Sequence, residues 1–139
     1  MTDMDTVKDR MMPAMISPGQ HAVLDYSVAA TFFGVGAALW NRHRPAASLA
    51  LLNGAMVLGM SLLTNYPGGM WRTLSFKTHR TGDIMQAALA GFGPALFGFS
   101  GDPEAKYFYG QALSEAGVIA ATDWEGTSSV GRGRIAATA

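Results

Sequence analysis

The sequence has no cysteine and few charged residues. Without cysteine, the chain has no disulfide, no thiolate zinc site and no thiol nucleophile. Charged residues make up 14% of the 139 residues and hydrophobic residues 49%, a balance that is unusual for a water-soluble domain. The ten Lys and Arg residues are scattered and the formal net charge is zero. No basic stripe follows a nucleic acid backbone, so we expect no nucleic acid partner.

The sequence motifs of common enzymes are also missing. No phosphate-binding glycine loop, G-x-S-x-G elbow or H-E-x-x-H helix occurs. We therefore predict that the protein is not an enzyme and has no catalytic residues, cofactor or bound metal. The first twenty residues mix acids and bases and lack the cleavage site of a signal peptide, so the apolar segments are expected to be retained.

Four apolar segments follow one another along the chain. At about 1.5 Å per residue, the first is roughly 28 Å long, close to the membrane hydrocarbon thickness of about 30 Å. The third contains Pro94, and the fourth is the most polar because it includes Glu115. The predicted transmembrane helices are 22–40, 46–64, 84–100 and 105–122.

The chain resembles itself at an offset of 58 residues. At this offset His21 aligns with His79, and Asp25 aligns with Asp83. Other aligned pairs are Pro45/Pro103, Thr64/Thr122, Gly68/Gly126, Asn65/Asp123 and Tyr66/Trp124. The predicted fold is all-α: a four-transmembrane-helix bundle of two tandem two-helix repeats, with a parallel pseudo-two-fold axis. The predicted parts are an N-terminal arm (1–11), repeat 1 (12–68), repeat 2 (70–126) and a disordered C-terminal tail (127–139).

The distribution of basic residues predicts an orientation in the membrane. Seven are expected on one side, namely Lys8, Arg10, Arg72, Lys77, Arg80, Arg132 and Arg134, against Arg42, Arg44 and Lys106 on the other. The positive-inside rule then predicts a multi-pass protein of the inner cell membrane with both termini in the cytoplasm. The lipid bilayer is the expected partner, with a homo-oligomer or a larger membrane complex as further possibilities. Residues interpreted as interfacial anchors are Trp40, Tyr66, Trp71, Tyr107, Tyr109 and Trp124.

The most distinctive chemical feature is a pair of H-x-x-x-D motifs. His21 and Asp25, and likewise His79 and Asp83, are spaced i, i+4, so each pair shares one helix face. Ionisable residues inside a membrane are candidates for a functional site, and Glu115 must face inward. The candidate polar cluster comprises His21, Asp25, Thr64, Asn65, His79, Asp83, Glu115, Thr122 and Asp123.

Three interpretations compete for this cluster. In the first, the polar groups tie helix ends together in a structural or partner-binding bundle, which is the function we predict. In the second, histidines and carboxylates bind a metal ion, or His21 and His79 bind haem. In the third, Glu115, Asp83 and the histidines relay protons or ions. Convergence of the four donors within about 5 Å would favour a metal site over the structural interpretation. A water-soluble bundle is a further alternative, because 105–122 is polar enough for one.

Three segments of the chain are HAVLDY (21–26), SLLTNY (61–66) and PALFGFSGD (94–102). In these segments, and over about 12–125, the chain resembles the SPW-repeat family of small prokaryotic membrane proteins. The Ser-Pro-Trp of that family appears here only as Pro94, between Gly93 and Ala95. The resemblance implies a duplicated two-helix fold and a membrane location, and it implies no catalytic residues.

Overall fold

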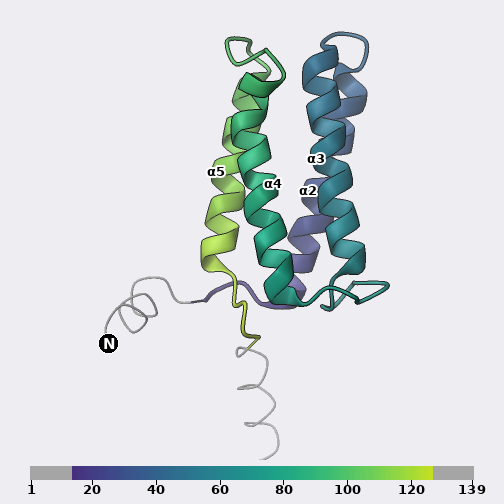
Figure 1. The fold of residues 1–139 in the computed structure, drawn as a ribbon, viewed down its shortest axis with the longest axis vertical. Coiled ribbons are helices and arrows are strands. Elements are labelled where there is room, and N and C mark those ends of the chain that lie inside the picture. Colours follow the sequence, from purple (N-terminus) through teal and green to yellow (C-terminus); the bar gives the residue numbers. More distant parts are fainter. Residues whose placement is uncertain (1–13, 127–139) are drawn as a thin grey trace, which may run out of the picture.

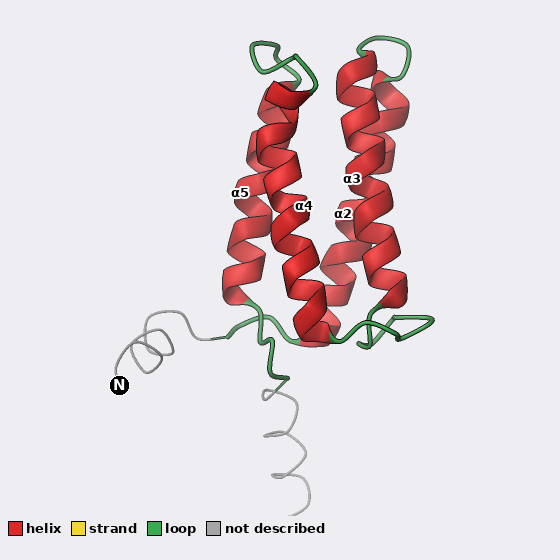
Figure 2. Cartoon of the chain, in the orientation of Figure 1, coloured by secondary structure: helices red, strands yellow, loops and turns green. Residues whose placement is uncertain are grey.

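The computed structural model describes residues 14–126, which form four α-helices and no strand beyond two isolated bridges (Figure 2). The helices are α2 (Pro18–Leu39), α3 (Arg44–Leu63), α4 (Phe76–Leu96) and α5 (Ala105–Ala121). The all-α prediction is confirmed. The predicted N-terminal arm and C-terminal tail lie outside the described residues.

The helices form two antiparallel hairpins that stand side by side (Figure 1). In one hairpin α2 packs on α3, in the other α4 packs on α5, and α3 and α4 join the two. The starts of α2 and α4 and the ends of α3 and α5 therefore lie at one end of the bundle. This end carries both H-x-x-x-D motifs.

Serine side chains begin the two helices that carry these motifs. Ser17 accepts a hydrogen bond from the backbone N–H of Gln20, whose side chain accepts one from the backbone N–H of Ser17, which is a complete capping box. Ser75 accepts from the backbone N–H of Thr78 in the same way. Each cap lies four residues before a histidine, so it fixes the first turn on which that histidine stands.

The bounds of α4 differ from the predicted span 84–100. The helix starts eight residues earlier than that span, at Phe76, and ends at Leu96 although Pro94 lies inside it. Gly98 has a φ of 77°, which a glycine adopts without steric cost. Its N–H donates to the carbonyl of Ala95, and the N–H of Phe99 donates to that of Pro94, forming a Schellman motif. This local turn, which the apolar pattern does not reveal, removes 97–100 from the helix.

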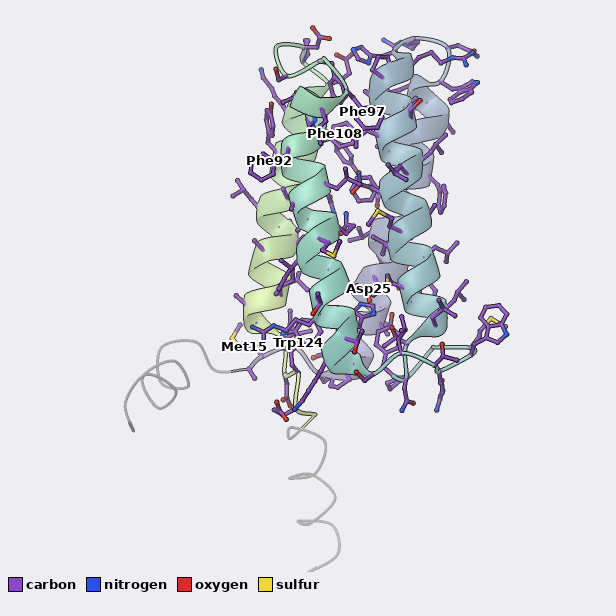
Figure 3. The ribbon with its side chains drawn as sticks, viewed as in Figure 1. Met15, Asp25, Phe92, Phe97, Phe108 and Trp124 are labelled. Atoms are coloured by element: carbon purple, nitrogen blue, oxygen red, sulfur yellow. The ribbon has the colours of Figure 1, made fainter. Side chains whose placement is uncertain are left out.

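The apolar core fills the half of the bundle near the two hairpin turns. Phe32 of α2, Leu49 of α3 and Phe108 of α5 are fully buried there (Figure 3 labels Phe108). At Gly93 of α4, an added Cβ would lie 2.5 Å from Cδ2 of Leu49. The close approach of α3 and α4 thus depends on a glycine at position 93.

Two of the helices, α2 and α3, are long and apolar enough to cross a membrane by length and composition. Of the apolar window in α2 only 28% is buried inside the structure, so most of that window faces outward. In a water-soluble protein, a helix this apolar is usually covered by the rest of the protein. Most of α2 is not covered by protein.

Candidate metal centre

Two histidines and two aspartates meet at the end of the bundle where α2 and α4 begin. His21 and Asp25 come from α2, and His79 and Asp83 come from α4; we call these four residues the His/Asp quartet. One donor atom from each residue can be chosen so that all four lie within 4.8 Å of one another. The two motifs therefore share one centre between the hairpins, and Figure 3 shows Asp25 at this end of the bundle.

Each histidine in the quartet contacts both carboxylates through Nε2. His21 Nε2 lies 3.3 Å from Oδ1 of Asp25 and 2.9 Å from Oδ2 of Asp83. His79 Nε2 lies 3.1 Å from Oδ2 of Asp25 and 3.0 Å from Oδ1 of Asp83. The side chains are nearly inaccessible, with exposed fractions of 1% for both histidines, 11% for Asp25 and 15% for Asp83.

Threonines at the ends of α3 and α5 orient the two imidazoles. Thr64 Oγ1 lies 2.6 Å from Nδ1 of His79, and Thr122 Oγ1 lies 2.9 Å from Nδ1 of His21. Each threonine hydroxyl already donates its only proton to a carbonyl four residues earlier, that of Met60 or Val118. Each Nδ1 must therefore be the N–H donor to its threonine, and each Nε2 is directed at the carboxylates.

Aromatic rings close the quartet at the end of the bundle. The Trp124 ring lies 4.9 Å from that of His21, and the Tyr66 ring lies 5.2 Å from that of His79, centroid to centroid. Phe76 packs on both covering rings, and the Tyr66 hydroxyl donates a hydrogen bond of 2.8 Å to Oδ2 of Asp25. These rings exclude water from the end of the site and hold one carboxylate in place.

A second polar layer lies between the quartet and the apolar core. The Gln86 amide of α4 donates to Oδ1 of Asn53 at 2.8 Å and to Oε1 of Glu115 at 3.3 Å. Gln111 also donates to Oε1 of Glu115, at 3.1 Å. The other oxygen, Oε2, is buried and has no hydrogen-bond partner in the described part of the chain. Glu115 thus has one oxygen held in place and one available.

A cavity of about 70 Å³ joins this layer to the quartet. It is only partly enclosed, and helices α2 and α5 supply most of its wall. The volume suffices for a small number of water molecules or a partly hydrated ion. Its lining includes His21, Asp25, Asp83, Gln86, Ser114 and Glu115.

Most of the predicted polar cluster is assembled at this end. Thr64 and Thr122 contact the histidines, while Glu115 lies beside the quartet and bonds to glutamines instead of joining it. Asp123 is buried, and its backbone N–H donates to the carbonyl of Ile16. Asn65 lies apart from these residues: it follows the C-cap of α3, its side chain is exposed, and its backbone N–H donates to the carbonyl of Leu74.

Sequence reasoning missed the covering role of two aromatic residues. Tyr66 is not the interfacial anchor that its position predicts, because it is 4% exposed and bonds to Asp25. Trp124, for which the same position predicts an anchor, packs on His21. The alignment of these two positions at the 58-residue offset was the one signal that set them apart from the other aromatic residues.

No family model, curated protein or solved structure matches the chain. Functional inference therefore depends on the geometry of the site.

Proposed function

We propose that the protein is a membrane-embedded helical bundle that binds one divalent transition-metal ion, with zinc as the best fit, through His21, Asp25, His79 and Asp83. The observation that carries this proposal is the orientation of both Nε2 atoms toward both carboxylates while threonines hold both Nδ1 atoms. In metal sites a ligating histidine commonly donates its other N–H to a neighbouring oxygen, which fixes the ring.

The spacing of the donor atoms supports a tetrahedral ion. With bonds of about 2.0–2.1 Å, a tetrahedral zinc places its ligand atoms about 3.3 Å apart. The four nitrogen-to-oxygen distances of 2.9 to 3.3 Å reach both oxygens of each aspartate, whereas a set with one donor atom from each residue lies within 4.8 Å. Side-chain shifts of up to about 1.5 Å bring such a set to the spacing of tetrahedral zinc.

The electrostatics of the quartet also favour a cation. Nε2 of His79 is buried between the two carboxylates, 3.1 Å from an oxygen of Asp25 and 3.0 Å from an oxygen of Asp83, so a cation bound there has three buried ligand atoms beside it. One divalent cation also balances the charges of Asp25 and Asp83, so the filled site is neutral when the imidazoles are neutral.

A membrane location is supported by the outward faces of α2, α4 and α5. The apolar window of α2 faces mostly outward, and large apolar side chains on α4 and α5 do the same. Phe92 is 71% exposed, Leu96 73% and Leu113 77%. Such side chains are favourable against lipid tails and unfavourable in water. We therefore extend the proposal to four membrane-spanning helices, with both termini in the cytoplasm.

The duplicated architecture is part of the same proposal. Ser17 and Ser75 cap α2 and α4, and Thr64 and Thr122 end α3 and α5, at the 58-residue offset. The backbone bridges Ile16 to Thr122 and Thr64 to Leu74 are also related by this offset. These correspondences support two tandem repeats, as the resemblance to the SPW-repeat family implies.

The direct test is metal binding by the purified full chain in detergent. The protein is stripped with chelator and titrated with Zn²⁺ and Co²⁺, with elemental analysis and the visible spectrum as readouts. We expect one ion per chain and the absorption of tetrahedral Co²⁺. At zinc concentrations near 100 times Kd, the free energy of unfolding should rise by about 2.7 kcal/mol.

The matched variant is Asp83→Asn, which keeps the size of the side chain and removes one charged ligand. This variant should retain helical content by circular dichroism and lose the tetrahedral spectrum and the stabilisation by zinc. His21→Ala/His79→Ala should lose both as well. A wild-type chain that stays colourless with Co²⁺ and gains no stability from zinc would overturn the metal proposal and leave a structural bundle.

A further inference from the structure

The route by which an ion reaches the quartet can be inferred from what covers it. At the end of the bundle, Trp124, Tyr66 and Phe76 pack against the histidines and against one another. Toward the hairpin turns, the fully buried core around Phe32 and Phe108 fills the bundle. The partly open cavity, lined mostly by α2 and α5, is an opening that reaches the quartet.

Glu115 lies in the wall of this cavity, and one of its two carboxylate oxygens is available to bind a cation. Its side chain comes from α5 and is 8% exposed, and Gln86 and Gln111 hold its Oε1 atom. Its Oε2 atom has no hydrogen-bond partner among the described residues. A carboxylate oxygen that is buried without a partner is costly, so it is expected to have a ligand that the protein itself does not supply.

Two polar residues of the cavity lining have apolar counterparts in the other repeat. At the 58-residue offset Glu115 aligns with Val57 and Gln86 aligns with Val28. The corresponding contact between α3 and α4 is closed by Met60 against Gly82, which align with the cavity-lining Val118 and Leu24. The duplication accounts for the quartet, because both repeats supply one His/Asp pair. It does not account for Glu115, Gln86 and the open cavity between α2 and α5, which have no counterpart in the other repeat.

We propose that Glu115 forms a transient site for the divalent ion and passes it through this cavity to the His/Asp quartet. The inference rests on the proposed metal-binding function. The entering ion exchanges water for Oε2 of Glu115 and then for the quartet ligands, whose carboxylates Asp25 and Asp83 line the same cavity. No covalent bond of the protein changes.

The experiment is stopped-flow loading of the metal-free full chain in lipid nanodiscs with Co²⁺, followed by its tetrahedral absorption. Glu115→Gln keeps an oxygen acceptor for Gln86 and Gln111 and removes the charge. We expect loading to slow at least about tenfold, since a negative charge at an entrance raises cation on-rates by 10–10³. Release to chelator should slow by the same factor, so Kd stays unchanged, because a site on the pathway affects both directions equally.

A second pair of variants tests the route without touching a charge. Ser114 is exposed and lines the cavity, whereas its neighbour Leu113 is exposed and does not line it. Ser114→Trp should slow loading and Leu113→Trp should leave the rate unchanged. Glu104→Gln, at the far end of the bundle, is the matched control for the lost carboxylate.

The outcomes separate the two proposals. If the wild-type chain takes up no Co²⁺, the proposed function fails and the route fails with it. If the wild-type chain loads and Glu115→Gln loads at the same rate, the route alone is wrong. A Glu115→Gln variant with weaker equilibrium binding and an unchanged loading rate would also overturn the route, because Glu115 would then act only by its charge on the filled site.

Discussion

The Nδ1 atom of His21 lies 2.9 Å from the hydroxyl oxygen of Thr122, which follows it by 101 residues. The backbone of Ile16, just before α2, bridges to Thr122 as well. The end of the last helix is thus joined to the start of the first. His79 and Thr64 repeat the contact between the other two helices. In both cases the threonine decides which imidazole nitrogen is directed toward the carboxylates.

The threonines should therefore control metal affinity without touching the ion. Replacing either one by valine, as Thr64→Val or Thr122→Val, keeps the shape and removes the acceptor for the Nδ1 proton. We expect Kd for zinc to rise about 10–100-fold, as is typical when a hydrogen-bond partner of a ligating histidine is lost. Competition titration with a chromophoric chelator measures this change. Thr31→Val, which removes an exposed hydroxyl bonded to the carbonyl of Ser27, should leave Kd unchanged.

The Tyr66 hydroxyl should contribute measurably to stability. Tyr66→Phe removes a buried donor to Asp25, and hydrogen bonds to charged groups contribute about 1.5–3 kcal/mol. The metal-free protein should therefore unfold at a lower temperature in detergent, as followed by circular dichroism. Tyr26→Phe is the control, because its exposed hydroxyl bonds only to the carbonyl of Gly68. Equal effects of the two substitutions would contradict a special role for the contact with Asp25.

Gly93 should be sensitive to a single methyl group. In Gly93→Ala the new Cβ would lie 2.5 Å from a fully buried Leu49 side chain, and overpacking of this kind costs roughly 1–3 kcal/mol. Gly117→Ala, where nothing lies within 4 Å of the added Cβ, should stabilise α5 by roughly 0.5–1 kcal/mol. Thermal unfolding of the two variants should shift in opposite directions. A neutral Gly93→Ala would show that α3 and α4 can separate without cost.

The hairpin turns should be joined more strongly in acid. His43 Nε2 lies 3.0 Å from Oδ2 of Asp102, and this hydrogen bond, opposed by partial burial and aided by Glu104, raises the pKa of His43 above its ordinary value of 6.5. A raised pKa means that folding favours the protonated imidazole. The added stability is fully present below pH 6.5 and is lost as pH rises through the folded-state pKa.

Comparing the wild-type chain with Asp102→Asn isolates this contribution. The difference in unfolding temperature between the two proteins should be larger at about pH 5.5 than at about pH 8.5, since histidine titrates between them. Lys77 and Glu125 form an exposed ion pair, so Glu125→Gln should show no such pH dependence. A difference that is constant with pH would contradict the role assigned to His43.

Much of the fold was predictable because it depends on local patterns. The apolar segments predicted helices at 22–40, 46–64 and 105–122, and α2, α3 and α5 lie within a few residues of these ranges. The 58-residue offset marked both H-x-x-x-D motifs as related. The predicted span 84–100 differs from α4 at both ends, because the helix starts after the cap at Ser75 and ends before the turn at Gly98. Neither a polar cap nor a glycine turn changes the pattern of apolar residues from which the span was predicted.

The sequence by itself determined an all-helical chain with two His/Asp pairs, because helix periodicity and i, i+4 spacing are properties of neighbouring residues. Only the tertiary structure decided that these pairs meet at one centre, that Tyr66 and Trp124 cover it, and that Asn65 stays outside. Contacts such as His21 with Thr122 depend on how two hairpins pack side by side. Glu115 shows the same division: its sequence position predicts burial, whereas the glutamines and the cavity around it come from all four helices.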